Sequence, residues 1–388
     1  MTQFATCLKQ FWDFVPKCIP HPHVTEMAKK TDNVLLDILE KNENINTDMI
    51  DILNHIYEQY VPVVPEALGE NVTERMVFEG DQLTNERAHS AQLNMANGIN
   101  SSSMLMGILH RTEGLHLCMN TCLYILETFY SSTSVRDIIP FENTGGQEKY
   151  HTGHDKCGIV VEGVTVAVMM ESDERYDGLH NYAVSFMKVA LLLREIRDAY
   201  KMGDGNRLFR NFKFLLLYFD QSVHFKYRSW VWRMLAYDLG LLLEYERYAY
   251  GWNMSVNVVG SIHSCIANDS LVETHVHKVK EMMRAQGTNV SYEAVRQACK
   301  CLGMVQSLLD EMSSFVSGRH ADYTQHKTED VTAMSSALLN MENIQHQATA
   351  EHANFPNFPN DLLSSVDLMK FNGWLHNQKT RAARDMQF

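Results

Sequence analysis

The amino-acid sequence predicts a mainly α-helical protein with a small β-sheet, of the α/β type. Apolar residues recur at the spacing of a buried helix face over most of the chain, whereas short apolar runs that suit strands occur at residues 76–78 and 105–109. The chain has 388 residues, of which 45% are hydrophobic, so it can bury a substantial core. Together these observations predict a few strands among many helices.

Residues 1–70 form the first predicted segment, which is helical. Two sets of apolar positions at helical spacing support it: Val34, Leu35, Ile38 and Leu39, and then Met49, Ile50, Leu53, Ile56 and Tyr57. Pro62 and Pro65 end the segment, because proline disfavours a continuing helix.

Residues 71–130 are predicted to form a strand–helix–strand–helix core that carries Asp81. A strand over 74–81 leads into a helix for which Thr84 is the expected N-cap. A second short strand covers 105–109, and a second helix covers 115–130.

Residues 131–260 are predicted to be a loop followed by a helical insertion. The loop is polar and contains one hairpin-like apolar run at 158–168. The pattern from about residue 179 to 250 is almost continuously helical, with a break at Gly203-Asp204-Gly205.

The last two segments are also predicted to be helical. Residues 261–330 hold the final core helices, which carry Glu273 and include a helix capped by Ser291. Residues 331–388 form a polar helical tail that is interrupted by prolines.

The charge balance restricts the classes of partner. The chain has 34 Lys and Arg against 47 Asp and Glu, a net charge of −13. A surface that binds nucleic acid throughout is excluded, because such binding needs many cations to replace the phosphate counterions. Contact with DNA is therefore limited to a local basic segment.

Residues 194–233 form such a segment, with nine Lys or Arg, four acidic residues and interleaved aromatic residues. Mixtures of this kind can follow a nucleic-acid backbone and stack on bases. An alternative stays open, in which the aromatic residues form the core of a helical bundle and the cations face solvent. The candidate nucleic-acid contacts are Arg207, Arg210, Lys213, Lys226 and Arg228.

The cysteines and the N-terminus predict an intracellular protein. Eight cysteines are scattered over the chain, and the first residues lack the basic and apolar pattern of a secretory signal. The longest apolar run, 214–219, is too short to span a bilayer, so no membrane contact is expected.

One cluster has the ligand types of a zinc site. Its members are His151, His154 and Cys157. A fourth ligand could come from His116 with Cys118 and Cys122. No second ligand pair at zinc-finger spacing accompanies the cluster, so a polar, glycine-rich loop is preferred and zinc is not expected as a cofactor.

Two acidic residues stand out by their positions. Asp81 follows a predicted strand in Gly80-Asp81-Gln82-Leu83-Thr84, and a carboxylate there is held rigidly at the edge where α/β sheets bind ligands and metals. The alternative role of Asp81 is to cap the following helix. Glu273 begins another helix, where an acid is ordinarily solvated and favoured by the helix dipole.

Five stretches, in order over about residues 70–330, together resemble a eukaryotic, transposon-associated family that is catalogued as domain of unknown function 6589. They are Gly80–Arg87, Gly203–Arg207, Trp252–Gly260, Ile266–Glu273 and Gly287–Ser291.

The resemblance implies a partial ribonuclease-H-like sheet with a large helical insertion, as in DDE transposases. It implies that Asp81 is the second acid of the catalytic triad, that Glu273 is the third, and that His116 lies in the histidine-bearing segment after the second strand. Asp81 and Glu273 would then bind Mg²⁺ or Mn²⁺. The resemblance also implies a protein that binds DNA in the nucleus.

The chain departs from the family pattern at several positions. The first acid of the triad should lie on an upstream strand, yet the upstream Asp residues fall in predicted helices, so the amino-terminal part of the domain is expected to be missing. The family has an Asp and an aromatic residue where this chain has Gly114 and Leu115. It has Pro and Leu where this chain has Ala267 and Ser270, and His-Leu-Asn at residues 274–276. We therefore expect a truncated or degenerate, catalytically inactive domain. An active one would cleave DNA or transfer strands with bound metal.

A hypothesis from another class remains open, namely a non-enzymatic helical module that binds protein partners. The 22 methionines suit adaptable apolar contact surfaces. The two hypotheses differ in whether the carboxylates of Asp81 and Glu273 converge in space.

Overall fold

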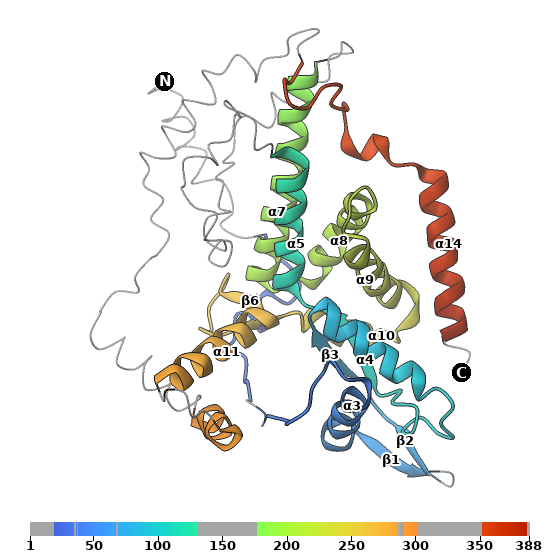
Figure 1. The fold of residues 1–388 in the computed structure, drawn as a ribbon, viewed down its shortest axis with the longest axis vertical. Helices are drawn as coiled ribbons and strands as arrows, with labels where there is room; N and C mark the ends of the chain where they lie inside the picture. Colours follow the sequence, from blue (N-terminus) through green and yellow to red (C-terminus); the bar gives the residue numbers. More distant parts are fainter. Residues whose placement is uncertain are drawn as a thin grey trace. The chain divides into compact units, whose positions relative to one another are not determined.

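The computed structural model of the chain is mostly helical, and the strands among its described residues form three two-stranded sheets (Figure 1). The described residues are 19–34, 36, 38–66, 69–130, 177–285, 287, 291–301 and 351–385. The prediction of a mainly α fold with a small β component is confirmed.

The described residues divide into two compact units. The first comprises 19–21, 119–130, 177–198 and 351–366. The second comprises the described parts of 22–118, 199–301 and 367–385. Every residue of the candidate site described below belongs to the second unit.

The second unit begins with two helices, α2 (Val24–Met27) and α3 (Asn46–Tyr60). The predicted helix at Met49–Tyr57 is thus confirmed within α3. The helix predicted around residues 34–39 is wrong, because the described residues of that stretch are not helical. Val34 is 77% exposed and Leu36 is 54% exposed, so these two apolar side chains contribute no burial that would stabilise a helix.

An antiparallel hairpin follows α3, where the sequence predicted only the end of a helix. Its strands are β1 (Val63–Glu66) and β2 (Gly69–Val72). Pro65 is accommodated in β1 because the sheet has two strands, so each strand is an edge strand.

A parallel strand pair forms the centre of the second unit. Strand β3 (Met76–Gly80) pairs with β4 (Ile108–Thr112), and α4 (Gln82–Asn94) connects them. Helix α5 (Gly114–Phe129) follows β4. The predicted order of strand, helix, strand and helix is confirmed.

The second strand begins at Ile108 and not, as predicted, at Leu105. Leu105 has a φ of 55°, which is a left-handed conformation that a strand excludes. Strand β4 instead runs through His110, Arg111 and Thr112, whose side chains are buried. Polar residues in a buried strand interrupt the apolar run by which strands are predicted.

The apolar core beside this strand pair joins α3, α4 and β4. Its buried members are Met49, Leu53, Tyr57, Val61, Ala88, Ala91, Leu105 and Ile108. Ala88 and Ala91 are small, so α4 can lie close to the strands and to α3 (Figure 1). This packing fixes the ends of the strands, from which the site is built.

The helices predicted from about residue 179 to 250 are present. Its described helices are α7 (Gly178–Met202), α8 (Gly205–Asp220), α9 (Phe225–Ala236), the π-helical turn η2 (Tyr237–Leu241) and α10 (Glu244–Trp252). The predicted break between α7 and α8 is confirmed. Gly203 has a φ of 68°, and the carboxylate of Asp204 caps α8 by accepting a hydrogen bond from the Arg207 N–H at 3.1 Å.

A short hairpin leads into the last core helix, in a region that was predicted to be a loop. Strands β5 (Ser255–Asn257) and β6 (Cys265–Ala267) are antiparallel, and α11 (Asn268–Ala285) begins directly after β6. Ser291 caps the helical residues 292–301 as predicted, since its Oγ accepts a hydrogen bond from the Ala294 N–H at 3.2 Å.

The first unit contains an aromatic cluster. Tyr182 of α7 is 1% exposed, and its hydroxyl donates to the carbonyl of Phe129 at 2.5 Å. Rings that pack on these two are Phe186, Phe355 and Phe358.

The described part of the predicted tail contains the 3₁₀ turn η4 (Leu362–Ser365) and α14 (Leu368–Asp385), and α14 belongs to the second unit. The predicted hairpin at 158–168 lies outside the described residues. Within the described part of the chain, no helix has both the length and the apolar composition that crossing a membrane requires.

Candidate functional site

Asp81 and Glu113 directly follow the ends of the two parallel strands. Gly80 is paired with Thr112, so the next residue of each strand lies at the same edge of the sheet. The Glu113 N–H donates to the carbonyl of Gly80 at 3.2 Å, which fixes this register. Burial raises the pKa of the Glu113 carboxyl, and the nearby carboxylates of Asp269 and Asp81 raise it further.

Asp81 is the N-cap of α4. Its Oδ1 accepts a hydrogen bond from the Thr84 N–H at 2.7 Å, so the alternative role expected for Asp81, capping the following helix, is confirmed and the prediction of Thr84 as the cap is wrong. The cap lies at Asp81 because the strand ends at Gly80 and the helix begins at Gln82. Oδ2 of Asp81 makes no hydrogen bond within the described residues, and the charge of Asp81 is near enough to affect the carboxyl of Glu113.

Asp269 reaches the same edge from a distant part of the sequence. It is the second residue of α11, its side chain is 1% exposed, and its Oδ2 accepts a hydrogen bond from the His116 N–H at 3.1 Å. His116 lies in the first turn of α5, so Asp269 satisfies an amide there that has no partner within the helix.

Glu113, His116 and Asp269 form one cluster, which we call the carboxylate–histidine corner. Nδ1 of His116 lies 2.9 Å from Oε2 of Glu113 and 3.4 Å from Oδ2 of Asp269. One ligand atom of each residue lies within 4.8 Å of the others. Hydrogen bonds to Asp269 and Glu113 raise the pKa of His116 to about 10, so at neutral pH an imidazolium joins two carboxylates.

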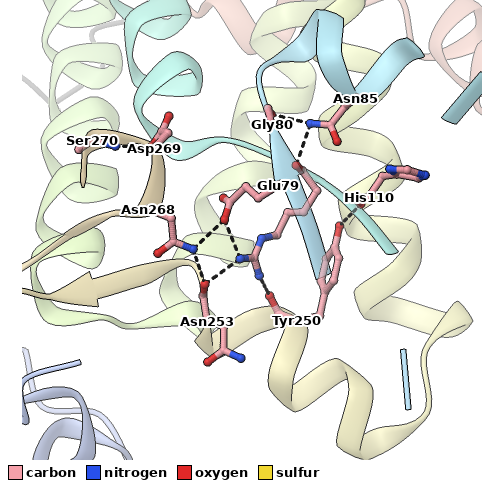
Figure 2. A network of polar contacts seen from close by, with 10 residues as sticks. Glu79, Gly80, Asn85, His110, Tyr250, Asn253, Asn268, Asp269 and Ser270 are labelled. Carbon is pink, nitrogen blue, oxygen red and sulfur yellow. Dashed lines mark hydrogen bonds and ion pairs between the residues drawn. The ribbon is translucent and has the colours of Figure 1, made fainter. Parts of the chain in front are cut away.

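A network around Arg111 connects the strand pair to the start of α11 (Figure 2). Arg111 is 1% exposed, and its Nη2 donates to Oε2 of Glu79 at 2.9 Å and to the carbonyl of Asn253 at 2.7 Å. Its Nη1 donates to the carbonyl of Tyr250. One buried guanidinium thus joins β3, β4 and the end of α10.

Asn268 completes the network and precedes Asp269 (Figure 2). Its Nδ2 lies 2.7 Å from Oε2 of Glu79 and 2.7 Å from the carbonyl of Asn253. Burial raises the pKa of Glu79, while Arg111 and Asn268 oppose that rise. The first residue of α11 is therefore tied to the strand pair, and this contact sets the position of Asp269.

Asn85 holds the two strand ends together (Figure 2). It is fully buried in α4, and its Nδ2 donates to the carbonyl of Gly80 at 2.5 Å and to the carbonyl of Arg111 at 2.8 Å. The carbonyls belong to β3 and β4, so one amide fixes the separation of the strands immediately before Asp81 and Glu113.

Glu273, the predicted third acid, is exposed on α11. It lies one helical turn after Asp269, on the same side of the helix. The buried acid that meets Glu113 and His116 is Asp269, and Glu273 is not a member of the corner. The sequence contained one signal for the pairing of Glu113 with His116. The two residues are three positions apart, a spacing that places both side chains on one face at the start of a helix.

The predicted nucleic-acid contacts separate into two groups. Arg207 is 6% exposed and lies 3.5 Å from a carboxylate oxygen of Asp204, and Arg228 is paired with Asp220 and stacks on Trp374. Neither is displayed to a nucleic acid. The exposed members are Arg210, Lys213 and Lys226.

The proposed zinc ligands His151, His154 and Cys157 lie outside the described residues. His116, considered as their partner, is instead engaged with two carboxylates. Cys118 is buried and Cys122 is half-buried in α5.

The fold and the site define a mainly helical protein with a carboxylate–histidine cluster at the ends of a parallel strand pair. The chain belongs to a family of unknown function, DUF6589, whose model matches residues 8–171 and 149–326. The match begins well before residue 70, so the family similarity extends further upstream than the five motifs predicted. No curated protein and no solved structure matches the chain significantly.

Proposed function

We propose that this protein is a transposase-derived, ribonuclease-H-like domain that binds one divalent cation at the carboxylate–histidine corner and does not catalyse strand cleavage. The observation that carries the proposal is the convergence of Glu113, His116 and Asp269 within 4.8 Å, beside Asp81.

The order of elements supports the ribonuclease-H-like assignment. An acid follows β3, a helix crosses to the parallel strand β4, and a buried acid returns on a late helix after a long helical insertion. Asp81 retains its predicted place as the middle acid. In this proposal Asp269 is the third acid, the role that the sequence assigned to Glu273, because Asp269 is the acid of α11 that contacts His116.

The donor set fits a divalent cation. Two carboxylates with a third nearby favour Mg²⁺ or Mn²⁺, and the imidazole shifts the preference toward Mn²⁺ because Mg²⁺ strongly prefers oxygen ligands. A bound cation would polarise a phosphoryl oxygen or lower the pKa of a bound water. Glu113 and Asp269 would hold it, Asp81 would face it from the end of β3, and His116 would bind as the neutral imidazole.

Two features support the absence of catalysis. Within the described residues the sheet that carries Asp81 has only two strands, so no neighbouring strand supplies the first acid of a triad. Asp269 and Asp81 also satisfy the amides at the starts of α5 and α4, which leaves fewer free oxygens for a second ion. Cleavage by a pair of metal ions needs ligands for both.

DNA is the proposed partner, through exposed cations of the insertion. Arg210 and Lys213 lie on α8 and are exposed, in a chain that is otherwise acidic. Such cations provide affinity through phosphate contacts, which weaken with added salt. A nuclear location follows from this proposal.

Titration calorimetry with Mn²⁺ tests the metal site. Glu113→Gln and Asp269→Asn are each expected to weaken binding at least about tenfold, because each removes an anionic ligand. Glu273→Gln is the matched control on the same helix and is expected to leave the affinity unchanged. Equal losses for Asp269→Asn and Glu273→Gln would restore Glu273 as a ligand, and no Mn²⁺ binding by the unmutated chain would end the proposal.

A nicking assay tests the second half of the proposal. Supercoiled plasmid incubated with the unmutated chain and Mn²⁺ is expected to stay intact, as it does with Asp81→Ala. Nicking that requires Asp81 would show an active nuclease.

A second candidate function is a non-enzymatic module that binds a protein partner. The observation that favours it is a set of exposed apolar side chains on η2 and α10. They are Leu239, Leu243, Tyr245 and Tyr248. Sedimentation of the chain alone tests self-association through this set, and Leu239→Ser with Leu243→Ser is expected to abolish any dimer formed there.

A further inference from the structure

A cavity of about 360 Å³ lies on the second unit, away from the carboxylate–histidine corner. It is bordered by the start of α3, one side of α4 and the start of α9, and its lining residues are Asn44, Asn46, Leu83, Glu86, Arg87, Ser90 and Lys226. We propose that this cavity binds a phosphate group, with Arg87 and Lys226 as its principal ligands.

The charges in the cavity favour an anion. Arg87 and Lys226 are its cations, and Glu86 is the single acid among its lining residues. Nζ of Lys226 lies 3.1 Å from Oε2 of Glu86, and Nε2 of Gln82 donates to the same oxygen at 2.6 Å. Burial alone would raise the pKa of Glu86, but these contacts lower it. Glu86 therefore stays ionised, and the ammonium of Lys226 balances its negative charge. A net positive charge remains on an acidic protein.

Arg87 is held in position by the loop before α3. Its Nη1 donates to Oδ1 of Asn44, and Nδ2 of Asn44 donates to Oδ1 of Asn42 at 3.0 Å. The other N–H donors of Arg87 make no hydrogen bond within the described residues. A guanidinium presents these donors as a planar fork that matches two phosphate oxygens.

The amino end of α3 adds to the attraction. The helix has 15 residues and begins at Asn46, which lines the cavity, and its N-cap Ile45 offers no side-chain acceptor. The first amides of such a helix, and its dipole, favour an anion. The acid of this turn, Asp48, is not among the lining residues, and its Oδ2 accepts a hydrogen bond from the Asn42 N–H at 3.0 Å.

The size of the cavity indicates more than a bare phosphate ion. A volume of about 360 Å³ falls in the range of small-ligand sites. Leu83 is 41% exposed there and supplies an apolar wall for a sugar or a base. Both a free nucleotide and the backbone of a nucleic acid present negatively charged phosphate oxygens beside a sugar, so the chemistry of the cavity suits either source.

This inference does not depend on the metal site, so the binding experiment is done in EDTA. Inorganic phosphate, adenosine monophosphate and a 15-nucleotide single strand are each titrated into the full chain, with calorimetry as the measurement. Arg87→Ala and Lys226→Ala are each expected to weaken binding about tenfold, and Glu86→Gln is expected to tighten it. Lys280→Ala, which removes an exposed cation on α11 outside the cavity, is the matched control and is expected to change the binding of each probe by less than twofold.

The outcomes distinguish the two sources of the phosphate. Binding of all three probes with the same dependence on Arg87 assigns the site to nucleotides, and binding of the single strand alone, again dependent on Arg87, assigns it to a nucleic-acid backbone. The proposal is overturned if none of the probes binds, or if Lys280→Ala weakens the binding of each probe as much as Arg87→Ala does while circular dichroism shows every variant folded.

Discussion

Nδ1 of His116 lies 3.4 Å from Oδ2 of Asp269, although the two residues are 153 positions apart in the sequence. The same ring nitrogen lies 2.9 Å from Oε2 of Glu113, so the imidazolium separates two carboxylates that would otherwise repel each other. The contact joins the start of α5 to the start of α11. It also means that a proton occupies the place that a metal ion would take.

His116 is predicted to make the folded protein less stable as the pH rises. Its pKa is about 10 when folded and near 6.5 when unfolded, so the stabilisation is complete below about pH 6.5 and is lost as the pH rises toward 10. Because the ring is partly exposed, we expect the loss to be only about 1–3 kcal/mol. Urea unfolding between pH 6.5 and 10 measures it.

His116→Gln is expected to be less stable than the unmutated chain at pH 6.5 and to show a flatter pH profile above it. His277→Gln is the control, because His277 forms only an exposed pair with Glu281 on α11. An unchanged profile in His116→Gln would show that the imidazolium does not join the carboxylates.

Metal binding at the corner is predicted to release a proton. His116 must lose its proton before its nitrogen can bind a cation, so the affinity for Mn²⁺ should rise with pH up to about 10. Calorimetry in two buffers with different ionisation enthalpies should give a release of about one proton per Mn²⁺ at pH 7.5. Binding without proton release would place the ion on the carboxylates alone.

The position of Asp81 could be predicted from the sequence because its causes are local. A strand pattern, an acid and a helical pattern follow one another within residues 76–95, and the structure places Asp81 at that junction. The sequence left the cap open between Thr84 and Asp81, because both are good N-cap residues, and the end of β3 decides for Asp81.

The partners of Asp81 could not be predicted in the same way. Asp269 follows Asn268, which is tied to Glu79 and Asn253, and these contacts span up to 189 positions. The predicted position of β4 was wrong because His110, Arg111 and Thr112 are buried polar residues, and local sequence patterns assign polar residues to the surface. Long-range polar networks of this kind leave no periodic signal.

Arg111→Met is predicted to destabilise the second unit by about 3–5 kcal/mol. The change removes the only cation that contacts Glu79 in the described structure and leaves a buried carboxyl without its charge partner. The double change Arg111→Met with Glu79→Gln should recover part of the loss, since it removes the unpaired charge. Urea unfolding at pH 7 measures the stability of the unmutated chain and of both variants, and equal stability of the single and double variants would mean that Glu79 is already neutral.

The buried histidines His89 and His110 are predicted to make the fold sensitive to acid. Burial, together with the positive charge of the nearby Arg233, lowers the pKa of His89 to about 2 and that of His110 to about 3. A lowered pKa means that the neutral form is favoured by folding, so this stabilisation is present above about pH 6.5 and is lost as the pH falls toward 3.

His89→Phe should reduce that acid sensitivity. Neither ring nitrogen of His89 makes a hydrogen bond within the described residues, and its ring packs edge-on against His110 and Trp230. A phenyl ring keeps those contacts and carries no nitrogen, so we expect the variant to be at least as stable at pH 7 and to unfold at lower pH. His55→Phe, an exposed position on α3, is the control and should leave the acid transition unchanged. Circular dichroism measures the pH midpoint of acid unfolding for each variant. Equal midpoints for His89→Phe and the unmutated chain would show that His89 does not drive the transition.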